Sequence, residues 1–324
     1  MITRRGLTIV LAGYALVIGS TVFAQSVNTV PVVGVLSLDN VGRIAPLREG
    51  LRALGYVDGQ NLRLQIVHPG DRYAQLPDIA AEFVRSRVNV IVSIGGTATI
   101  AASKATRSIP IVMIAGIDPV REKLAVSLSR PGGNVTGVST VLQELSAKRL
   151  ELAKEAIPGL KDIGILVNPN SISGMGALPE AKDAAERLNI QLNIVEVRSA
   201  ADFDTAFSAL AKTRSKAFLT LPSNMLISNR KEVLDAARKH GLAGFYTSAD
   251  WAQQGGLFAY AASDADAIKR VANYVSRILK GAKAADLPIE QPTKFELFVN
   301  LKTARALNIK IPSSILLQAT KVIE

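Results

Sequence analysis

The sequence predicts an α/β protein built from two doubly wound lobes, each a parallel sheet with helices on both faces. Three observations lead to this prediction. After about residue 30, apolar segments of strand length alternate with amphipathic segments of helix length. The strand-like segments are apolar throughout, which is typical of strands buried on both faces. A segment rich in glycine and proline, residues 130–140, interrupts the alternation, and the series then restarts.

The first series contains four predicted strands with helices between them. The strands are "VPVVGVLSLD" (30–39), the end of "GYVDGQNLRLQIV" (55–67), "VNVIVSIGG" (88–96) and "IPIVMIAG" (109–116). Apolar residues at spacings of three and four predict helices near residues 47–54, 76–87 and 97–106. A further helix is expected to begin in "DPVREKLAVSLS" (118–129), because Asp118 can be its N-cap and Pro119 suits its first turn. A short strand is expected within 130–140.

The second series repeats this pattern over a similar length, as expected for a second domain. Its predicted strands are 161–169, 191–197, 216–223, 243–248 and 255–263. Its predicted helices are 177–189, 201–212, 229–241 and the long segment 264–281. The tail, 287–324, adds a strand and a short helix.

The N-terminus has the layout of a secretory signal peptide. Arg4 and Arg5 precede an apolar stretch, Leu7 to Ile18, and the small residue Ala24 follows. That apolar stretch is shorter than the roughly 18 residues that a membrane-spanning helix needs. We therefore expect residues 1–24 to be a signal peptide and the mature chain to be exported without a membrane anchor. A buried N-terminal helix is the alternative interpretation.

Composition narrows the class of protein. The chain has 324 residues, 48% of them hydrophobic, and a net charge of +11. Its lysines and arginines are scattered and only 5% of its residues are aromatic, so a nucleic-acid groove is not expected. There is no cysteine, which excludes disulfides, thiolate sites and a lipid-modified cysteine, and favours the periplasm. The two histidines, His68 and His240, are far apart, so we expect neither a metal nor a cofactor.

Ligands of doubly wound sheets bind outside the carboxyl ends of the strands. With two lobes facing each other, those ends would line one cleft. The candidate ligand-binding residues are therefore the polar and small residues at predicted strand ends: Asp39, Asn40, Ser93, Gly95, Gly96, Thr97, Ala98, Asp118, Asn168, Ser223, Asn224, Ser248 and Asp250.

The stretch from Gly95 to Thr99 is the most specific of these candidate motifs. It lacks the glycine spacing of a dinucleotide fingerprint and the lysine of a P-loop. Paired glycines before a helix could hold a carboxylate through backbone N–H groups, or could form only a tight turn capped by Thr97. Asp118 and Asp250 could accept a hydrogen bond from a ligand ammonium or hydroxyl group, and a helix N-cap is the alternative role for Asp118.

The sequence contains no nucleophile elbow, no zinc-protease motif and no evident pair of nucleophile and base. A binding protein is therefore favoured over an enzyme. An exported enzyme that acts on a small carboxylate in the same cleft remains the alternative.

The chain resembles the substrate-binding proteins of ABC transporters, in the family that includes tryptophan- and tyrosine-type amino-acid binding proteins. The resemblance runs from Val30 to Glu324 and rests on the order of several motifs: "GLRALGYVDGQNL", "GGTATIAASKAT", "IPIVMIAGIDPV", "RPGGNVTGVS", "IGILVNPNS" and "FVNLKTARALNIKIPSSILLQATKVI".

The resemblance implies a type I periplasmic-binding-protein fold, in which two lobes are joined by a three-strand hinge near residues 140, 262 and 291. The first lobe would then contain residues 25–140 and 263–290, so that the long helix returns to it, and the second lobe 141–262 and 291–324. It also implies that Ser93, Thr97 and Ala98 meet a ligand carboxylate and that Asp118 lies at the cleft.

The chain departs from the family where Pro222, Ser223 and Asn224 replace a stretch that often carries an acidic residue. An α-amino ligand is therefore less favoured, and a plain or aromatic carboxylate stays open. The expected function is a monomeric periplasmic receptor that closes over a small carboxylate and delivers it to an ABC permease in the inner membrane. A sensory role would use the same fold.

Overall fold

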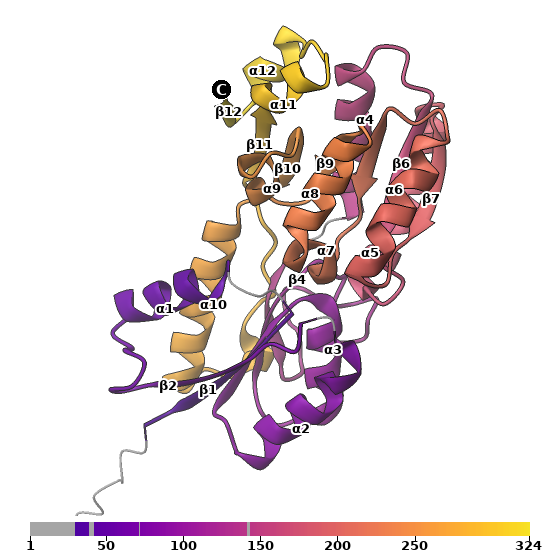
Figure 1. Cartoon of the computed structure of the whole chain (residues 1–324). Coiled ribbons are helices and arrows are strands. Elements are labelled where there is room, and N and C mark those ends of the chain that lie inside the picture. Colours follow the sequence, from indigo (N-terminus) through magenta and orange to yellow (C-terminus); the bar gives the residue numbers. More distant parts are fainter. Residues whose placement is uncertain (1–29, 39–41, 71, 141–142) are drawn as a thin grey trace, which may run out of the picture.

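The computed structural model describes residues 30–38, 42–70, 72–140 and 143–324. The predicted signal peptide, Asp39 and Asn40 lie outside the described residues. The described chain forms two α/β lobes, one above the other (Figure 1), which confirms the predicted fold class. None of the described helices combines the length and apolar character needed to cross a membrane.

The first lobe is built on a five-stranded sheet in which every pair of neighbours is parallel, in the order β2-β1-β3-β4-β5. Its buried strands are rich in Val and Ile, as the unbroken apolar segments predict. Helices α1 and α10 cover one face of the sheet, and α2 and α3 cover the other. The bounds are β1 Val32–Ser37, α1 Ile44–Ala53, β2 Arg63–Val67, α2 Leu76–Arg85, β3 Val90–Ile94, α3 Gly96–Ala105, β4 Ile111–Ala115, β5 Val135–Ser139 and α10 Asp264–Leu279.

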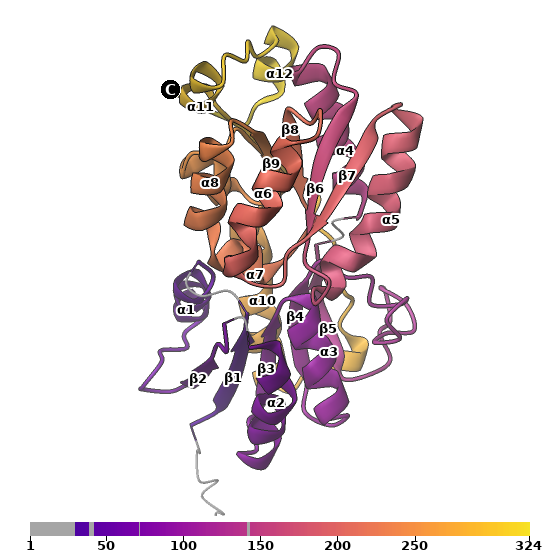
Figure 2. The ribbon, with the colours of Figure 1, turned by 45° about the vertical axis from the view of Figure 1, so that its right-hand side comes forward.

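The second lobe has a seven-stranded sheet in the order β12-β11-β10-β9-β8-β6-β7. Helices α4, α5, α11 and α12 pack on one face, and α6 to α9 pack on the other (Figure 2). The bounds are α4 Gln143–Ala156, β6 Asp162–Val167, α5 Ile172–Arg187, β7 Gln191–Glu196, α6 Phe203–Ala211, β8 Ala217–Thr220, α7 Asn224–Ser228, α8 Arg230–Lys239, β9 Ala243–Tyr246, α9 Ala249–Gln253, β10 Phe258–Ala262, β11 Phe295–Asn300, α11 Leu301–Ala306, α12 Ser313–Gln318 and β12 Lys321–Ile323.

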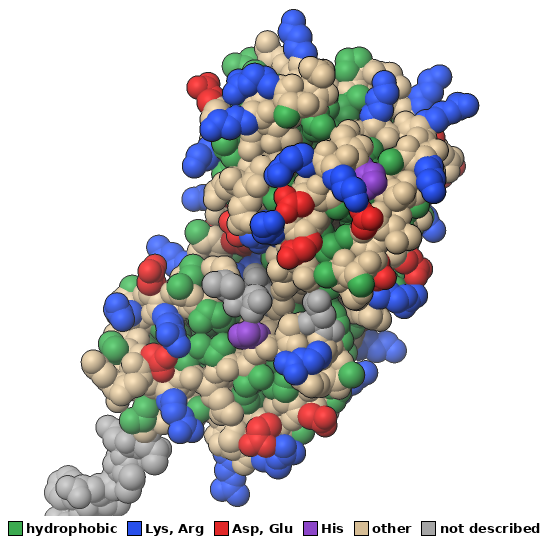
Figure 3. Space-filling view, in the orientation of Figure 1, with side chains coloured by type: hydrophobic (Ala, Val, Ile, Leu, Met, Phe, Trp, Pro, Cys, Tyr) green, Lys and Arg blue, Asp and Glu red, His purple; other side chains and the backbone are tan. Residues whose placement is uncertain are grey.

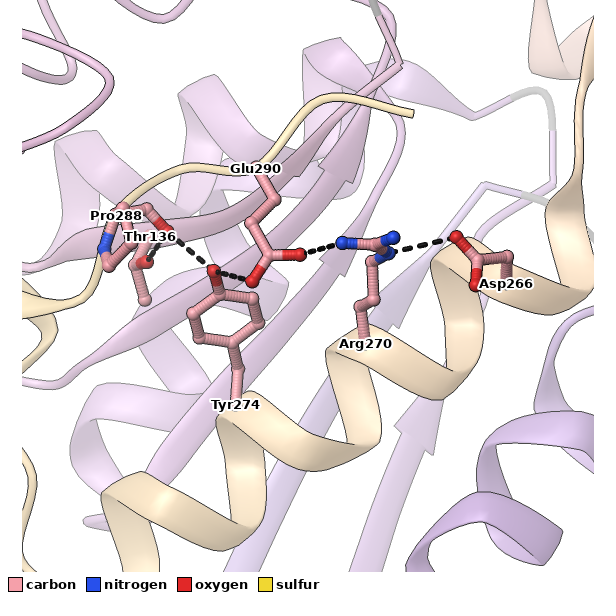
Figure 4. A network of polar contacts seen from close by, with 6 residues as sticks. All are labelled: Thr136, Asp266, Arg270, Tyr274, Pro288 and Glu290. Atoms are coloured by element: carbon pink, nitrogen blue, oxygen red, sulfur yellow. Dashed lines mark hydrogen bonds and ion pairs between the residues drawn. The ribbon is translucent and has the colours of Figure 1, made fainter. Parts of the chain in front are cut away.

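Three segments connect the two sheets: the one after β5, the one between β10 and α10, and the one before β11. The third is tied to the first lobe, because Glu290 bonds through its backbone to Gly137 and Ser139 of β5, each at 2.9 Å. Its side chain accepts hydrogen bonds from Tyr274 and Arg270 of α10, and Arg270 also pairs with Asp266 (Figure 4). This network fastens the connecting segment to α10.

Two features differ from the expectation. The predicted helix at 118–129 is wrong: this segment forms turns. The Asp118 carboxylate accepts hydrogen bonds from Val120 and Arg121 as a cap would, but Lys123 adopts a left-handed conformation with φ +56° and so interrupts helical propagation. The second sheet is also not wholly parallel, since β11 runs antiparallel to β10.

Charged side chains are distributed over both lobes. On the face shown in Figure 3, Lys and Arg side chains are scattered, with Asp and Glu side chains among them. This face therefore does not concentrate the positive charge in one stripe.

Candidate functional site

The strand–turn–helix at residues 93–99 brings backbone N–H groups to the edge of the first lobe. Gly95 has φ +104°, a conformation that favours glycine, and α3 begins at the next residue. The first N–H groups of a helix have no carbonyl partner within it. The backbone N–H and the side-chain hydroxyl of Thr99 both donate hydrogen bonds to the Gly95 carbonyl oxygen, at 3.0 and 2.9 Å. The N–H groups before Thr99 are thus the ones that can bind an anion.

The second lobe approaches this turn closely. A Cβ added to Gly95 would lie 2.7 Å from the Nδ2 atom of Asn224, and one added to Gly96 would lie 2.7 Å from the Ser173 hydroxyl. The Thr97 hydroxyl lies 3.4 Å from the Asn170 carbonyl oxygen, also across the lobes. The two glycines therefore allow an approach that any side chain would obstruct.

A small cavity of about 50 Å³ lies between the lobes at this point. Its lining comes from the ends of strands in both sheets and from the starts of helices: Arg43, Gly95, Ile114, Ala115, Gly116, Thr140, Ser173, Pro222, Ser223, Asn224, Ile227, Thr247, Ala262 and Asp264. The volume is small because the lobes are nearly in contact, so a ligand larger than a few water molecules requires the cavity to enlarge.

Arg43 and Asp264 are the charged residues among the described lining residues. They form an ion pair of 2.8 Å where α1 and α10 begin, and the Asp264 side chain is 40% exposed. The guanidinium can bind a carboxylate, and the carboxylate can accept a hydrogen bond from an ammonium group. The pair thus offers both kinds of partner at one side of the cavity.

Comparison with known proteins identifies the family. The family described as "ABC transporter substrate binding protein" matches residues 29–323. The chain belongs to this family. A tyrosine-binding protein of Clostridioides difficile (strain R20291) is 26% identical to this substrate-binding protein over 263 residues, which is 81% of this chain and 75% of that protein.

Solved structures agree with the fold. A conserved domain protein from Vibrio cholerae O1 biovar eltor is 28% identical, with a TM-score of 0.84, and covers 91% of this chain and 100% of its own. A structure from Streptococcus pneumonia, described as an ABC domain in complex with L-Trp, is 24% identical, with a TM-score of 0.81, over 90% of this chain and 100% of its own. The fold of this substrate-binding protein is therefore that of type I periplasmic binding proteins.

Several of the residues predicted to bind a ligand lie at or beside the cavity. Gly95, Ser223 and Asn224 line it, and Gly96 and Thr97 face the opposite lobe. Asn168 is buried behind it, where its Nδ2 atom lies 3.3 Å from the Ser223 hydroxyl.

Other predicted residues lie in other positions. Ser93 and Ala98 are buried within the first lobe, and Ser93 shares a hydrogen bond of 3.0 Å with Thr99. Asp118 caps its own turn and does not line the cavity. Asp250 is 47% exposed and pairs at 3.5 Å with Arg230, and Ser248 beside it is buried; neither lines the cavity.

The sequence analysis missed five polar lining residues: Arg43, Thr140, Ser173, Thr247 and Asp264. Thr140 and Thr247 each follow a strand directly, so the strand-end rule that found Ser223 could have found them. Arg43 and Asp264 stand at helix starts 221 positions apart in the chain. No local pattern links them.

Proposed function

We propose that this protein is a periplasmic solute receptor of an ABC importer, which closes its lobes over a small carboxylate-bearing ligand and delivers it to a permease in the inner membrane. The observation that carries the proposal is the glycine turn at Gly95 and Gly96, which presents the first turn of α3 to the opposite lobe across the cavity. Free N–H groups and the helix dipole at such a position favour a carboxylate.

An amino acid is the ligand class that we place first, and an aromatic or other organic acid second. The tyrosine-binding relative and the L-Trp complex support an amino acid. The sequence has no acidic residue at 222–224, but Asp264 provides a carboxylate at the cavity from another element. The Asp264 carboxylate can accept a hydrogen bond from the ligand ammonium group, while the first N–H groups of α3 bind the ligand carboxylate.

Transport follows from a difference in affinity between two arrangements of the lobes. A ligand that contacts both lobes stabilises the closed arrangement, and the three connecting segments supply the hinge. In this proposal the receptor acts as a monomer, is not anchored to the membrane, and releases its ligand chemically unchanged.

A thermal-shift screen of the chain from Gln25 onward tests the proposal. Amino acids, aromatic acids, aliphatic carboxylates and purines would be added one at a time, with chromatography of the recovered ligand. A ligand at about a hundred times its dissociation constant adds about 2.7 kcal/mol to stability. We expect one carboxylate class to raise the melting temperature and to be recovered intact. A ligand that is consumed, or a screen in which no carboxylate acts, would contradict the proposal.

Asp264→Asn separates the two ligand classes. If the ligand is an amino acid, the variant should bind it more weakly, while binding of the same acid without its amino group should change little. Equal weakening of both would show that Asp264 does not meet the ammonium group. Asp250→Asn is the matched control, because Asp250 is an exposed acidic residue outside the cavity lining.

A further inference from the structure

One buried cation in the second lobe has no counter-ion among the residues that the structure describes. Arg149 of α4 is 1% exposed, and burial lowers its pKa to about 9, so it is charged at neutral pH. Its Nε atom donates to the Tyr260 carbonyl at 2.9 Å. Among the described residues, its Nη1 and Nη2 atoms have no hydrogen-bond partner. A buried charge without a partner costs folding free energy, so a purely structural role would be better filled by an apolar side chain.

The strand register places Tyr260, to whose carbonyl this cation is bonded, beside a residue that lines the cavity. The pairing of Ala259 with Tyr246 puts the next residue of β10, Tyr260, beside Thr247. Thr247 lines the cavity, and so does Ala262, two residues further along β10. Side chains of a helix lean toward its N-terminus, and α4 begins just after the lining residue Thr140. Arg149 does not itself line the cavity, but its guanidinium is bonded to a residue that neighbours the lining.

A second unpaired donor lies on the same face of α4. Ser146, one turn before Arg149, is fully buried and its hydroxyl has no partner among the described residues. Residues three apart on a helix are neighbours. Two buried donors thus lie side by side on one face of α4.

The two charged residues that line the described cavity have opposite charges, so together they contribute no net charge. Arg43 and Asp264 are paired with each other at 2.8 Å. Within the described part of the chain, Arg149 is a buried positive charge for which no ion pair is found. In a low-dielectric interior, such a charge acts over several ångströms without direct contact.

We propose that Arg149 is the specificity-determining charge of the cleft, which selects ligands that carry a carboxylate over ligands of the same shape that lack one. This inference rests on the proposed function, since it names a residue that recognises the carboxylate of the proposed ligand. The unpaired charge lowers the stability of the ligand-free protein, and the ligand carboxylate offsets this loss when it enters the cavity.

Calorimetric titration at pH 7 tests the inference. The probes are L-tryptophan and L-tyrosine and, for each, the corresponding carboxamide, which has the same shape without the negative charge. The variants are Arg149→Met, which removes the charge, and Arg149→Lys, which keeps it. Lys148→Met is the matched control, because it removes the same charge from a 38% exposed side chain of the same helix.

We expect Arg149→Met to bind the carboxylate at least tenfold more weakly, to bind the carboxamide no more weakly than the wild type does, and to melt no lower than the wild type without ligand. Arg149→Lys and Lys148→Met should keep the preference for the carboxylate. If Arg149→Met melts lower, fails to fold, or weakens both probes equally, Arg149 only anchors α4 and the inference is wrong. If the wild type binds neither carboxylate, and no other acid from the thermal-shift screen, the proposed function fails together with the inference.

Discussion

The Nδ2 atom of Asn224 in the second lobe lies 3.4 Å from the carbonyl oxygen of Ile94 in the first. The two residues stand at corresponding places, Ile94 as the last residue of β3 and Asn224 as the first residue of α7 after β8. Their contact shows that the carboxyl ends of the two sheets face one another. The small cavity beside them is the space that remains between the lobes.

Enlarging a side chain at this contact should hold the lobes apart. Ser173 of α5 lies opposite Gly96, where even a Cβ on the glycine would come within 2.7 Å of the Ser173 hydroxyl. We expect Ser173→Leu to increase the radius of gyration in small-angle scattering and to weaken ligand binding about tenfold or more, because it disfavours the closed arrangement by at least about 1.4 kcal/mol. Ser173→Ala is the control and should keep the radius of gyration of the wild type. An unchanged radius of gyration in Ser173→Leu would contradict this account.

The connecting segment at Glu290 should lose its attachment when the charge is removed. Glu290 accepts a hydrogen bond from the Tyr274 hydroxyl at 2.8 Å and pairs with Arg270 (Figure 4). We expect Glu290→Gln to lower the free energy of unfolding in urea by about 1–2 kcal/mol, a hydrogen-bonded, partly buried pair being worth more than an exposed one. The control is Glu82→Gln, which breaks an exposed pair with Arg85 and should cost under about 0.5 kcal/mol. If both variants lost the same free energy of unfolding, the network around Glu290 would stabilise the protein no more than an exposed ion pair does.

Alkaline pH should act on the protein through Tyr246. Burial raises the pKa of its phenol far above the ordinary value near 10. The unfolded state therefore ionises first, so the stability that this group contributes is complete below about pH 10 and falls by about 1.4 kcal/mol per pH unit above it. We expect Tyr246→Phe to match the wild type at pH 7 and to lose less stability between pH 10 and 11, as measured by urea unfolding at each pH. If the free energy of unfolding fell equally in both proteins over this range, Tyr246 would not be the group responsible.

Gly137 should be intolerant of any side chain. It has φ +126°, and an added Cβ would lie 2.2 Å from the backbone oxygen of Met113 on the neighbouring strand. We expect Gly137→Ala to destabilise the protein by about 3 kcal/mol, because the backbone is strained and the clash cannot be relieved by a side-chain rotation. Gly55→Ala is the control: Gly55 has φ +89° but open space around it, so the cost should be about 1 kcal/mol. Thermal or urea unfolding measures the stability of both variants. Equal losses of stability would mean that backbone strain accounts for the whole effect and that the contact with Met113 adds nothing.

The sequence was sufficient for the fold class and for part of the site. Strands such as Val90–Ile94 are apolar at every position but Ser93 and buried at all of them, and a strand of that kind can be stable only between two layers of helices. Gly95, Ser223 and Asn224 were predicted because residues directly after a parallel strand lie at its carboxyl end in either lobe. The failed helix at 118–129 shows the limit of local signals, since a good N-cap at Asp118 did not outweigh the turn at Lys123.

The tertiary structure alone decided which charges meet. Arg43 and Asp264 become partners because the chain leaves the second sheet after β10 and α10 packs beside α1 on the first. Arg149 meets the Tyr260 carbonyl, 111 positions later in the chain, only because α4 packs on β10. Periodicity along the chain reports which face of an element is buried, but contacts between distant elements depend on connection and register, which no local pattern contains.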